Sequence, residues 1–191
     1  MIPGDEEPKE EIIFSTRLPP KPRPDTSFQK ICKHQLGLNL RYCSNFYGKA
    51  AADSIFQQLE SHLPSYFSSS QQTVSLAGRV QSIPRRHAAF GDHGLSYSFS
   101  GITMPANPWI PLVSSLRDHV GEALGGETFN FVLVNRYRDG SDHIGEHRDN
   151  ERELVQTAPI ASLSFGQPRD FVLRHRDSRG RRGGGGGRRR V

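Results

Sequence analysis

The chain has 191 residues and a formal net charge of +5, which suits one globular domain with its own core and is too short for two domains of ordinary size. A basic balance favours polyanionic partners such as nucleic acid, although basic proteins without such a partner are common. The two cysteines, Cys32 and Cys43, match neither a zinc pattern nor a disulfide framework. No apolar run is long enough to span a membrane, and no signal-peptide pattern opens the chain. We therefore expect an intracellular protein with no membrane partner.

Two regions precede the first expected helix. Residues 1–26 mix acidic residues with a proline cluster, Leu18 to Pro24, a composition that cannot bury enough apolar surface to offset the entropy of ordering. We therefore expect a flexible tail over residues 1–26. From Phe28 to Phe46 the apolar residues alternate loosely, which indicates strands or irregular structure at the start of the fold.

Two segments show the three- and four-residue spacing of apolar side chains that predicts amphipathic helices. The first runs from Tyr47 to Leu63 and ends at Pro64, since proline cannot continue a helix. The second runs from Leu112 to Leu124 and stops at two glycines, after a connector from Pro105 to Pro111. The first helix is expected to brace a sheet.

Between these helices, a serine- and glutamine-rich stretch from Ser65 to Ser75 predicts a loop, and the basic run Gly78 to His87 follows. Its cationic side chains suit phosphate contacts, but a solvated basic loop explains them equally well. Leu95 to Phe99 alternates as a strand whose aromatic residues, Tyr97 and Phe99, share one face. Most aromatic pairs at this spacing belong to a core.

Three further strands are expected. Phe129 to Val134 is apolar enough to lie inside a sheet. Ile160 to Phe165 and Phe171 to His175 have strand composition and are separated by a turn at Gly166. The sequence then becomes rich in arginine and glycine, which indicates a flexible tail over residues 178–191 suited to nucleic-acid backbones.

The residues with metal-binding and acid–base chemistry gather between Asn135 and Glu151, and the most informative are His147 and Asp149. In an extended run, alternate side chains project to the same side. This imidazole and this carboxylate can therefore supply two of the three ligands of the two-histidine, one-carboxylate triad that holds non-haem Fe(II). A histidine and an aspartate two residues apart are also common in polar loops, so the pair alone does not establish a metal site.

A zinc site competes for the same residues. His143 to His147 fits the H-x-x-E-H pattern of inverted zincins, in which two histidines on a helix bind zinc and the glutamate, here Glu146, acts as general base. The pattern requires a helix, and Gly145 together with the turn residues before His143 disfavours one. Iron at His147 and Asp149 is therefore the preferred hypothesis.

Three ordered blocks extend the pattern. They read F-N-F-V-L-V-N-R-Y-R-D-G from Phe129, H-I-G-E-H-R-D from His143, and S-L-S-F-G from Ser162 with R-D-F after it. Together they resemble the AlkB family of Fe(II)- and 2-oxoglutarate-dependent dioxygenases, over residues 27–177. The resemblance implies an α+β domain built on a double-stranded β-helix, a jelly roll, with flanking N-terminal helices.

The resemblance also implies a cofactor and a co-substrate. Fe(II) would be held by His147 and Asp149, and 2-oxoglutarate would be hydrogen-bonded by Asn135 and Tyr137. With O2, the family oxidises an N-methyl group on a DNA base such as 1-methyladenine or 3-methylcytosine, and the oxidised group leaves as formaldehyde. This chain is accordingly expected to be an oxidative DNA demethylase that repairs alkylated bases directly.

The expected substrate contacts follow from the same resemblance. A base extruded from the stack would lie on Phe99, with Tyr97 hydrogen-bonding nearby and Glu151 beside the base. In the family, the basic region carries a hairpin whose apolar tip wedges into the duplex. Here Val80 is followed by polar and aliphatic residues without an aromatic tip. The resemblance therefore supports a phosphate contact by Arg85 more than an intercalating finger.

The family also needs a second iron-ligand histidine and an arginine for the far carboxylate of 2-oxoglutarate, both on strands that would follow Val191. His175 is the only histidine after Asp149, and it lies on a strand that carries no ligand in the family. We therefore expect the 191-residue chain alone to bind iron poorly and to be inactive or nearly so. A nucleic-acid-binding protein without catalysis is the alternative. The resemblance further implies a nuclear location and a monomer.

Overall fold

The computed structural model describes residues 18–23, 26–33, 38–67, 73–76, 79–99 and 101–175. The predicted tail over residues 178–191 lies outside the described residues, as does most of the predicted tail over 1–26. Along the described chain, two hairpins flank the first helix and its short 3-10 turn, and the second helix lies between the seventh and eighth strands.

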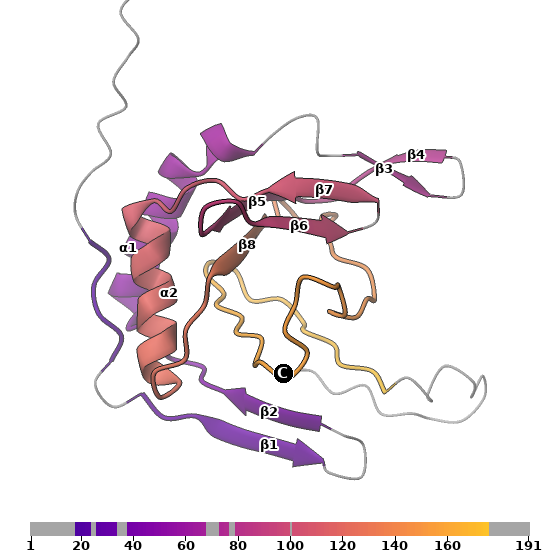
Figure 1. The fold of residues 1–191 in the computed structure, drawn as a ribbon. Helices are drawn as coiled ribbons and strands as arrows, with labels where there is room; N and C mark the ends of the chain where they lie inside the picture. Colours follow the sequence, from indigo (N-terminus) through magenta and orange to yellow (C-terminus); the bar gives the residue numbers. More distant parts are fainter. Residues whose placement is uncertain are drawn as a thin grey trace, which may run out of the picture.

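The helices α1 (Lys49–His62) and α2 (Pro111–Ala123) lie side by side on one flank of the strands (Figure 1). Their contact is apolar, because the fully buried Ile55 of α1 clusters with Tyr47 and with Leu116 of α2. The two predicted helices are thus confirmed. The second ends where two consecutive glycines take up positive φ, as predicted.

The strands β5 (Arg86–Gly91) and β8 (Phe131–Arg136) pair antiparallel and give the fold two distinct faces. Side chains alternate along a strand, so one face of this ladder is apolar and packs toward the helices. That face consists of Ala88, Phe90, Val132 and Val134. The opposite face carries His87 and Asn135, which are register partners.

An ion pair fastens α1 to the end of β8. Arg136 donates from Nε to Oε1 of Glu60 and from Nη2 to Oε2, each at 2.6 Å. This contact lowers the pKa of Glu60 and raises the pKa of Arg136, as expected for a bidentate arginine–carboxylate pair. The pair fixes α1 against the strand that also carries Asn135.

Three hairpins complete the strand pairs of the described chain. The strand β1 (Gln29–Lys33) pairs with β2 (Leu38–Tyr42), and β6 (Ser96–Phe99) pairs with β7 (Ile102–Pro105). The short 3-10 turn η2 (Pro64–Tyr66) follows α1 directly. The expectation of a mixed fold with helices and antiparallel strands is therefore confirmed.

The third hairpin corrects one prediction. The strand β3 (Thr73–Leu76) pairs with β4 (Arg79–Ser82) and projects from the body on the side away from the helices (Figure 1). The end of the stretch Ser65–Ser75, expected as a loop, thus lies in β3, and the basic run that follows contains β4 and the first residues of β5. Strand pairing overrides the polar local composition here, because each strand gains a hydrogen-bonded neighbour. The tip of the hairpin, residues 77–78, lies outside the described residues.

Backbone hydrogen bonds join Asn107, two residues after the β6–β7 hairpin, to β5. Asn107 N donates to Ala89 O at 2.9 Å, and Gly91 N donates to Asn107 O at 3.1 Å. The approach is close at Gly91, where an added Cβ would lie 3.1 Å from both Ala106 Cβ and Phe131 Cδ2. The aromatic residues of β6 are in this way held near the second face of the β5–β8 ladder.

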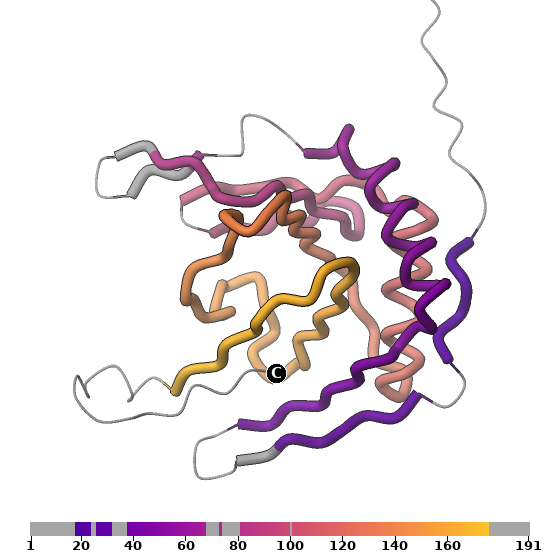
Figure 2. The backbone as a smooth tube through the Cα atoms, turned by 180° about the vertical axis from the view of Figure 1, so that it is seen from behind, coloured from indigo at the N-terminus to yellow at the C-terminus, as the bar shows by residue number. Residues whose placement is uncertain are grey.

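The prediction of two strands late in the chain is wrong. Residues 160–165 and 171–175 form no ladder with any described segment, and residues 137–175 run irregularly between β5–β8 and β1–β2 (Figure 2). Leu163 and Phe165 nevertheless pack against the α1–α2 contact, so these apolar residues contribute to the core without forming a strand. A strand also requires a neighbour to accept and donate its hydrogen bonds, and composition does not supply one.

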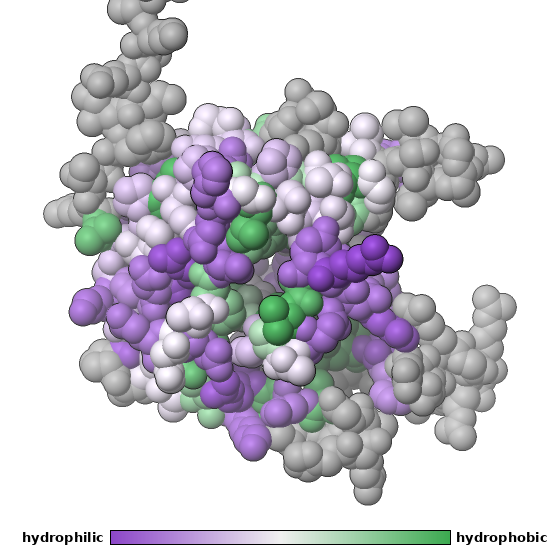
Figure 3. Space-filling model, in the orientation of Figure 1, coloured by the Kyte–Doolittle hydropathy of each residue, from purple (hydrophilic) through white to green (hydrophobic). Residues whose placement is uncertain are grey.

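The surface combines charged and apolar side chains. The face drawn in Figure 3 is largely hydrophilic with scattered apolar groups. Six of the exposed large apolar residues lie in the irregular segment 137–175, namely Ile144, Val155, Ile160, Phe171, Val172 and Leu173. No described helix is long and apolar enough to cross a lipid bilayer.

The buried helix contact generates a stability prediction. We expect Ile55→Ala to lower the free energy of unfolding by about 2–5 kcal/mol, because it removes apolar atoms and leaves a cavity. Ile55→Val keeps most of the volume and should cost only about 0.5–1.5 kcal/mol. Urea unfolding followed by circular dichroism measures both. Equal losses for the two variants would contradict the tight packing of Ile55 between the helices.

Candidate active site

The second face of the β5–β8 ladder brings three polar side chains together. Arg85, immediately before β5, donates from Nε to Oδ1 of Asn135 at 2.9 Å. His87 lies directly across from Asn135 in the strand register. Burial, the largest influence, lowers the pKa of Arg85, while the nearby hydroxyls of Tyr137 and Tyr97 oppose that shift. The predicted phosphate residue is therefore turned inward, toward the predicted co-substrate residues.

Aromatic rings from β6 lie against this face. The ring centroids of Tyr97 and Phe99 are 5.8 Å apart with an interplanar angle of 31°, so the two predicted base-contacting residues share one side of the strand. Phe99 meets His87 edge to face at 5.5 Å, and Tyr97 lies 5.5 Å from Phe131. Tyr97 is buried and Phe99 is half-buried. The shared face predicted for Tyr97 and Phe99 is confirmed.

Glu151 belongs to the same neighbourhood. Its charge raises the pKa of Tyr97, second only to the effect of burial. The Oε2 atom of Glu151 is itself buried without a hydrogen-bond partner. An unpartnered buried carboxylate oxygen is costly in a protein interior. The structure thus brings Tyr97, Phe99 and Glu151 to one place, where one carboxylate oxygen of Glu151 has no partner among the described residues.

His147 and Asp149 also meet. The Nε2 atom of His147 lies 3.3 Å from Oδ1 of Asp149, and both side chains are about half exposed. The Nδ1 atom of His147 lies 2.8 Å from the carbonyl oxygen of Gly145. A carbonyl can only accept, so Nδ1 carries the proton when this bond forms. The lone pair of Nε2 then faces the side of the loop on which the Asp149 carboxylate lies.

This arrangement fits two positions of a metal site. Histidines that ligate metals usually donate their second ring N–H to a carbonyl or carboxylate, which fixes the tautomer, and Gly145 provides that acceptor for His147. Among the residues that the structure describes, no group of three His, Cys, Asp or Glu side chains is close enough to hold a metal ion. The described chain therefore offers an imidazole and a carboxylate for Fe(II), and the third ligand of a facial triad is not among its side chains.

The zincin alternative is wrong. Residues 143–147 form no helix, and the ring of His143 bonds back to its own loop, with Nδ1 2.9 Å from Ser141 O. The backbone N–H of His143 donates to Pro84 O at 2.8 Å. The two histidines therefore lack the one-turn spacing on a helix face that the zinc pattern requires.

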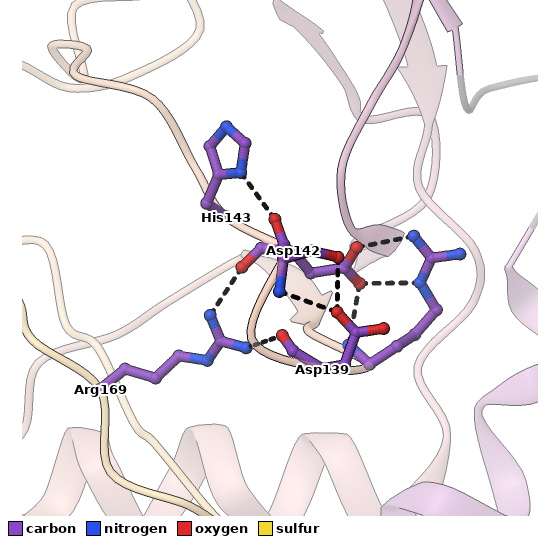
Figure 4. Close-up of polar contacts among 6 residues, drawn as sticks. Asp139, Asp142, His143 and Arg169 are labelled. Atoms are coloured by element: carbon purple, nitrogen blue, oxygen red, sulfur yellow. Dashed lines mark hydrogen bonds and ion pairs between the residues drawn. The ribbon is translucent and has the colours of Figure 1, made fainter.

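A buried aspartate anchors the loop that leads to His147 (Figure 4). Asp142 is 1% exposed, and its Oδ2 accepts from both the backbone N and the Nε of Arg138 at 2.8 Å. Its Oδ1 accepts from Nη2 of Arg138 at 2.6 Å. These bonds hold the pKa of Asp142 far below the ordinary value for an aspartate. Sequence reasoning treated this aspartate only as a turn residue, although the four-residue spacing of the ion pair is visible in the sequence.

Arg169, which lies far from this loop in the sequence, binds two of its backbone carbonyls. Its Nη1 donates to Asp142 O at 2.6 Å and its Nη2 donates to Asp139 O (Figure 4). The guanidinium also lies over the ring of Tyr137, 4.8 Å from the ring centroid. Arg169 therefore ties the late irregular segment to the loop and to a predicted co-substrate residue. Sequence reasoning missed it, since nothing local to residue 169 indicates these contacts.

Comparison with known proteins adds the following findings. The sequence profile of the 2OG-Fe(II) oxygenase superfamily matches residues 39–184. The chain is 55% identical over 145 residues to human DNA oxidative demethylase ALKBH2, covering 76% of this chain and 54% of that protein. It is 37% identical over 133 residues to bovine alpha-ketoglutarate-dependent dioxygenase alkB homolog 3, covering 69% and 44% respectively.

A plant protein is also similar. Over 141 residues the chain is 32% identical to DNA oxidative demethylase ALKBH2 of Arabidopsis thaliana, covering 72% of this chain and 44% of that protein. The chain thus spans about half the length of the curated relatives that it matches.

The Asp142 anchor predicts a pH-dependent loss of stability. Asp142→Asn removes the charge that binds Arg138 and should lower the free energy of unfolding by about 1–3 kcal/mol at pH 7. The folded pKa of Asp142 is depressed from 3.8. Its contribution is therefore fully present above that unfolded value and is lost as the pH falls below it.

Urea unfolding at neutral pH and at about pH 3 tests both statements. The difference between wild type and Asp142→Asn should shrink at the lower pH. Asp139→Asn, the same change at an exposed residue of the loop, should cost less. A difference between wild type and Asp142→Asn that stays constant down to pH 3 would contradict the anchor.

The His147–Asp149 pair predicts weak, specific metal binding. We expect Mn(II) to bind weakly in calorimetric titration, because two protein ligands are in place. Losing a second-sphere partner alone weakens metal affinity by about 10–100-fold, so His147→Ala should weaken it at least tenfold. His143→Ala, a matched change four residues away, should leave the affinity unaltered. Equal losses for the two variants would assign the metal elsewhere.

Proposed function

Since the chain belongs to the 2OG-Fe(II) oxygenase superfamily, with AlkB homologues among its relatives as the sequence blocks predict, we propose that it acts in oxidative demethylation of N-alkylated DNA bases. The substrates would include 1-methyladenine and 3-methylcytosine. The observation that carries the proposal is the juxtaposition of His147 and Asp149, whose Nε2 and Oδ1 atoms are 3.3 Å apart. An imidazole nitrogen and a carboxylate oxygen presented side by side can serve as two of the three ligands of a facial triad.

In this proposal, His147 and Asp149 hold Fe(II), and Asn135 and Tyr137 hydrogen-bond 2-oxoglutarate. When bound, Fe(II) and 2-oxoglutarate would couple the reduction of O2 to oxidation of the N-methyl carbon, which then leaves as formaldehyde. Two contacts support the assignment of the co-substrate residues. Arg85 donates to Asn135, and Arg169 lies over Tyr137, so each side chain is held in position by a cation.

The base site would lie between Tyr97, Phe99 and Glu151. A base extruded from the stack is held by an aromatic face and by hydrogen bonds to its edge, and these residues supply a ring, a hydroxyl and a carboxylate. The unpartnered Oε2 of Glu151 supports a role in accepting a hydrogen bond from the base. Arg85 uses one N–H on Asn135, and an arginine has five. The remaining donors of Arg85 are proposed to contact a phosphate.

Several wider features are proposed on the resemblance to the family. The fold would be a double-stranded β-helix, and the antiparallel pairing of β5 with β8 beside the β6–β7 hairpin is compatible with one. A dioxygenase domain over residues 27–177, a monomeric state and a nuclear location are supported by the resemblance alone.

A second candidate function is nucleic-acid binding without catalysis. It is favoured by one observation, that no three potential metal ligands come together within the described parts of the chain. The basic balance of the sequence suits this function equally well. The two candidates differ on turnover and agree on binding to an alkylated strand.

The test is a demethylation assay. A single-stranded oligonucleotide with one 1-methyladenine is incubated with the protein, Fe(II), 2-oxoglutarate and O2, and mass spectrometry follows loss of the methyl group. We expect slow turnover at most, because the described residues offer two ligands where the triad needs three. Any turnover should require both Fe(II) and 2-oxoglutarate and should disappear in Asp149→Ala.

Matched variants separate the two candidates. His143→Ala should keep whatever activity the wild type has. Binding of the methylated strand without any turnover, at all iron concentrations, would favour the non-catalytic candidate. Turnover that survives Asp149→Ala would contradict the proposed metal site.

A further inference from the structure

His87 is a buried imidazole that the roles assigned above do not use. It is 2% exposed, and neither Nδ1 nor Nε2 has a hydrogen-bond partner. Most buried polar side-chain atoms are hydrogen-bonded, and an unpartnered one lowers stability. A buried ring with two unsatisfied nitrogens therefore calls for an explanation in terms of something that binds there.

The surroundings of His87 coincide with the proposed base site. The ring of Phe99 lies 5.5 Å away at an interplanar angle of 81°. Asn135 is directly across the ladder, and Arg85 lies two residues earlier on the same face. Burial, and then the charge of Arg85, lower the pKa of His87. At neutral pH the ring is uncharged and offers one donor and one acceptor.

A second unpartnered polar atom lies in the same neighbourhood. Glu151 Oε2 is buried without a partner, and its carboxylate acts on Tyr97. Tyr97 and Phe99 are in turn ring neighbours. Two unsatisfied polar groups thus accompany one aromatic pair. If the cluster were only a part of the core, apolar side chains of similar size would stabilise it more than these unpartnered polar groups do.

We propose that His87 is a specificity-determining residue of the base site, where one ring nitrogen hydrogen-bonds to the polar edge of the nucleobase that stacks on Phe99. The proposal rests on the proposed function, because it presupposes that an extruded base enters this site. A base parallel to Phe99 would lie nearly perpendicular to the imidazole. A ring nitrogen of His87 can then meet the edge of the base while its face stays on Phe99.

The alternative ligand for His87 is the co-substrate, and the chemistry disfavours it. A dicarboxylate is bound best by cations, and arginine with its fork of donors is the preferred partner. The uncharged ring of His87 is a poor carboxylate ligand beside Arg85. The edge of a nucleobase carries donors and acceptors together, which matches the mixed capacity of a neutral imidazole.

The experiment compares binding of two strands that differ only in the base. Fluorescence anisotropy measures affinity for a single-stranded oligonucleotide with one 1-methyladenine and for the same strand with an abasic site. The wild type should prefer the methylated strand. His87→Phe keeps a ring without hydrogen-bonding atoms, and should weaken binding of the methylated strand about 3- to 10-fold. Its affinity for the abasic strand should stay unchanged.

Two further variants serve as controls. His87→Gln restores a donor and an acceptor and should recover part of the preference. His93→Phe makes the same substitution at an exposed turn and should have no effect on either strand. Because His87→Phe removes two unpartnered polar groups from the interior, its Tm should be equal to or above that of the wild type. A structural role through bound water would instead lower the Tm and leave the preference intact.

The outcomes separate this inference from the function on which it rests. A wild type that prefers the methylated strand, together with His87→Phe that keeps the full preference, overturns the role of His87 and leaves the proposed function standing. A wild type without preference overturns both. If His87→Phe does not fold, the ring nitrogens of His87 are followed by NMR in the wild type. Their signals should shift with the methylated strand and not with the abasic one, and unmoved signals overturn the proposal.

Discussion

The antiparallel pairing of β5 with β8 is the constraint on which the remaining structure depends. Because alternate side chains project to opposite faces of the ladder, the same six register pairs create an apolar face for the helices and a polar face for the candidate site. A shift by one residue would exchange the two faces. It would place Phe90 among the polar groups and His87 against α1 and α2, so the register determines the core and the chemistry together.

The loop that carries His147 depends on a different kind of interaction. The loop forms no strand ladder, and the buried carboxylate of Asp142 fixes its position. This carboxylate accepts hydrogen bonds from Arg138, and the backbone carbonyl of Asp142 accepts one from Arg169. Buried charges of this kind stabilise a conformation when every lone pair finds a donor. The ladder thus supplies rigid positions for Asn135 and the aromatic pair, while hydrogen-bonded charges place the metal-binding residues.

The sequence pattern predicts those features of the molecule that depend on residues close together in the chain. The helices follow from the spacing of apolar residues, the shared face of Tyr97 and Phe99 from strand alternation, and the proximity of His147 and Asp149 from their two-residue separation. The expected strands at the end of the chain fail because a strand needs a neighbour, which its own sequence does not encode. His87 is missed for the same reason, because its burial depends on β8, which lies tens of residues away in the sequence. Asp142 is missed although its partner Arg138 lies only four residues earlier, because that spacing does not show that the carboxylate is buried.

The lack of a strand ladder in residues 144–175 has a consequence for how readily different parts of the molecule open. Past Asp142, these residues are held by side chains and a few turns rather than by strand hydrogen bonds. Their amides should exchange with solvent through small local openings, whereas those of β5 and β8 exchange only when the ladder separates. The half of the candidate site that would hold the metal is therefore expected to open more readily than the ladder that carries Asn135. Metal binding would restrict those openings, so the affinity for the ion would report the local stability of this segment as well as the strength of its ligands.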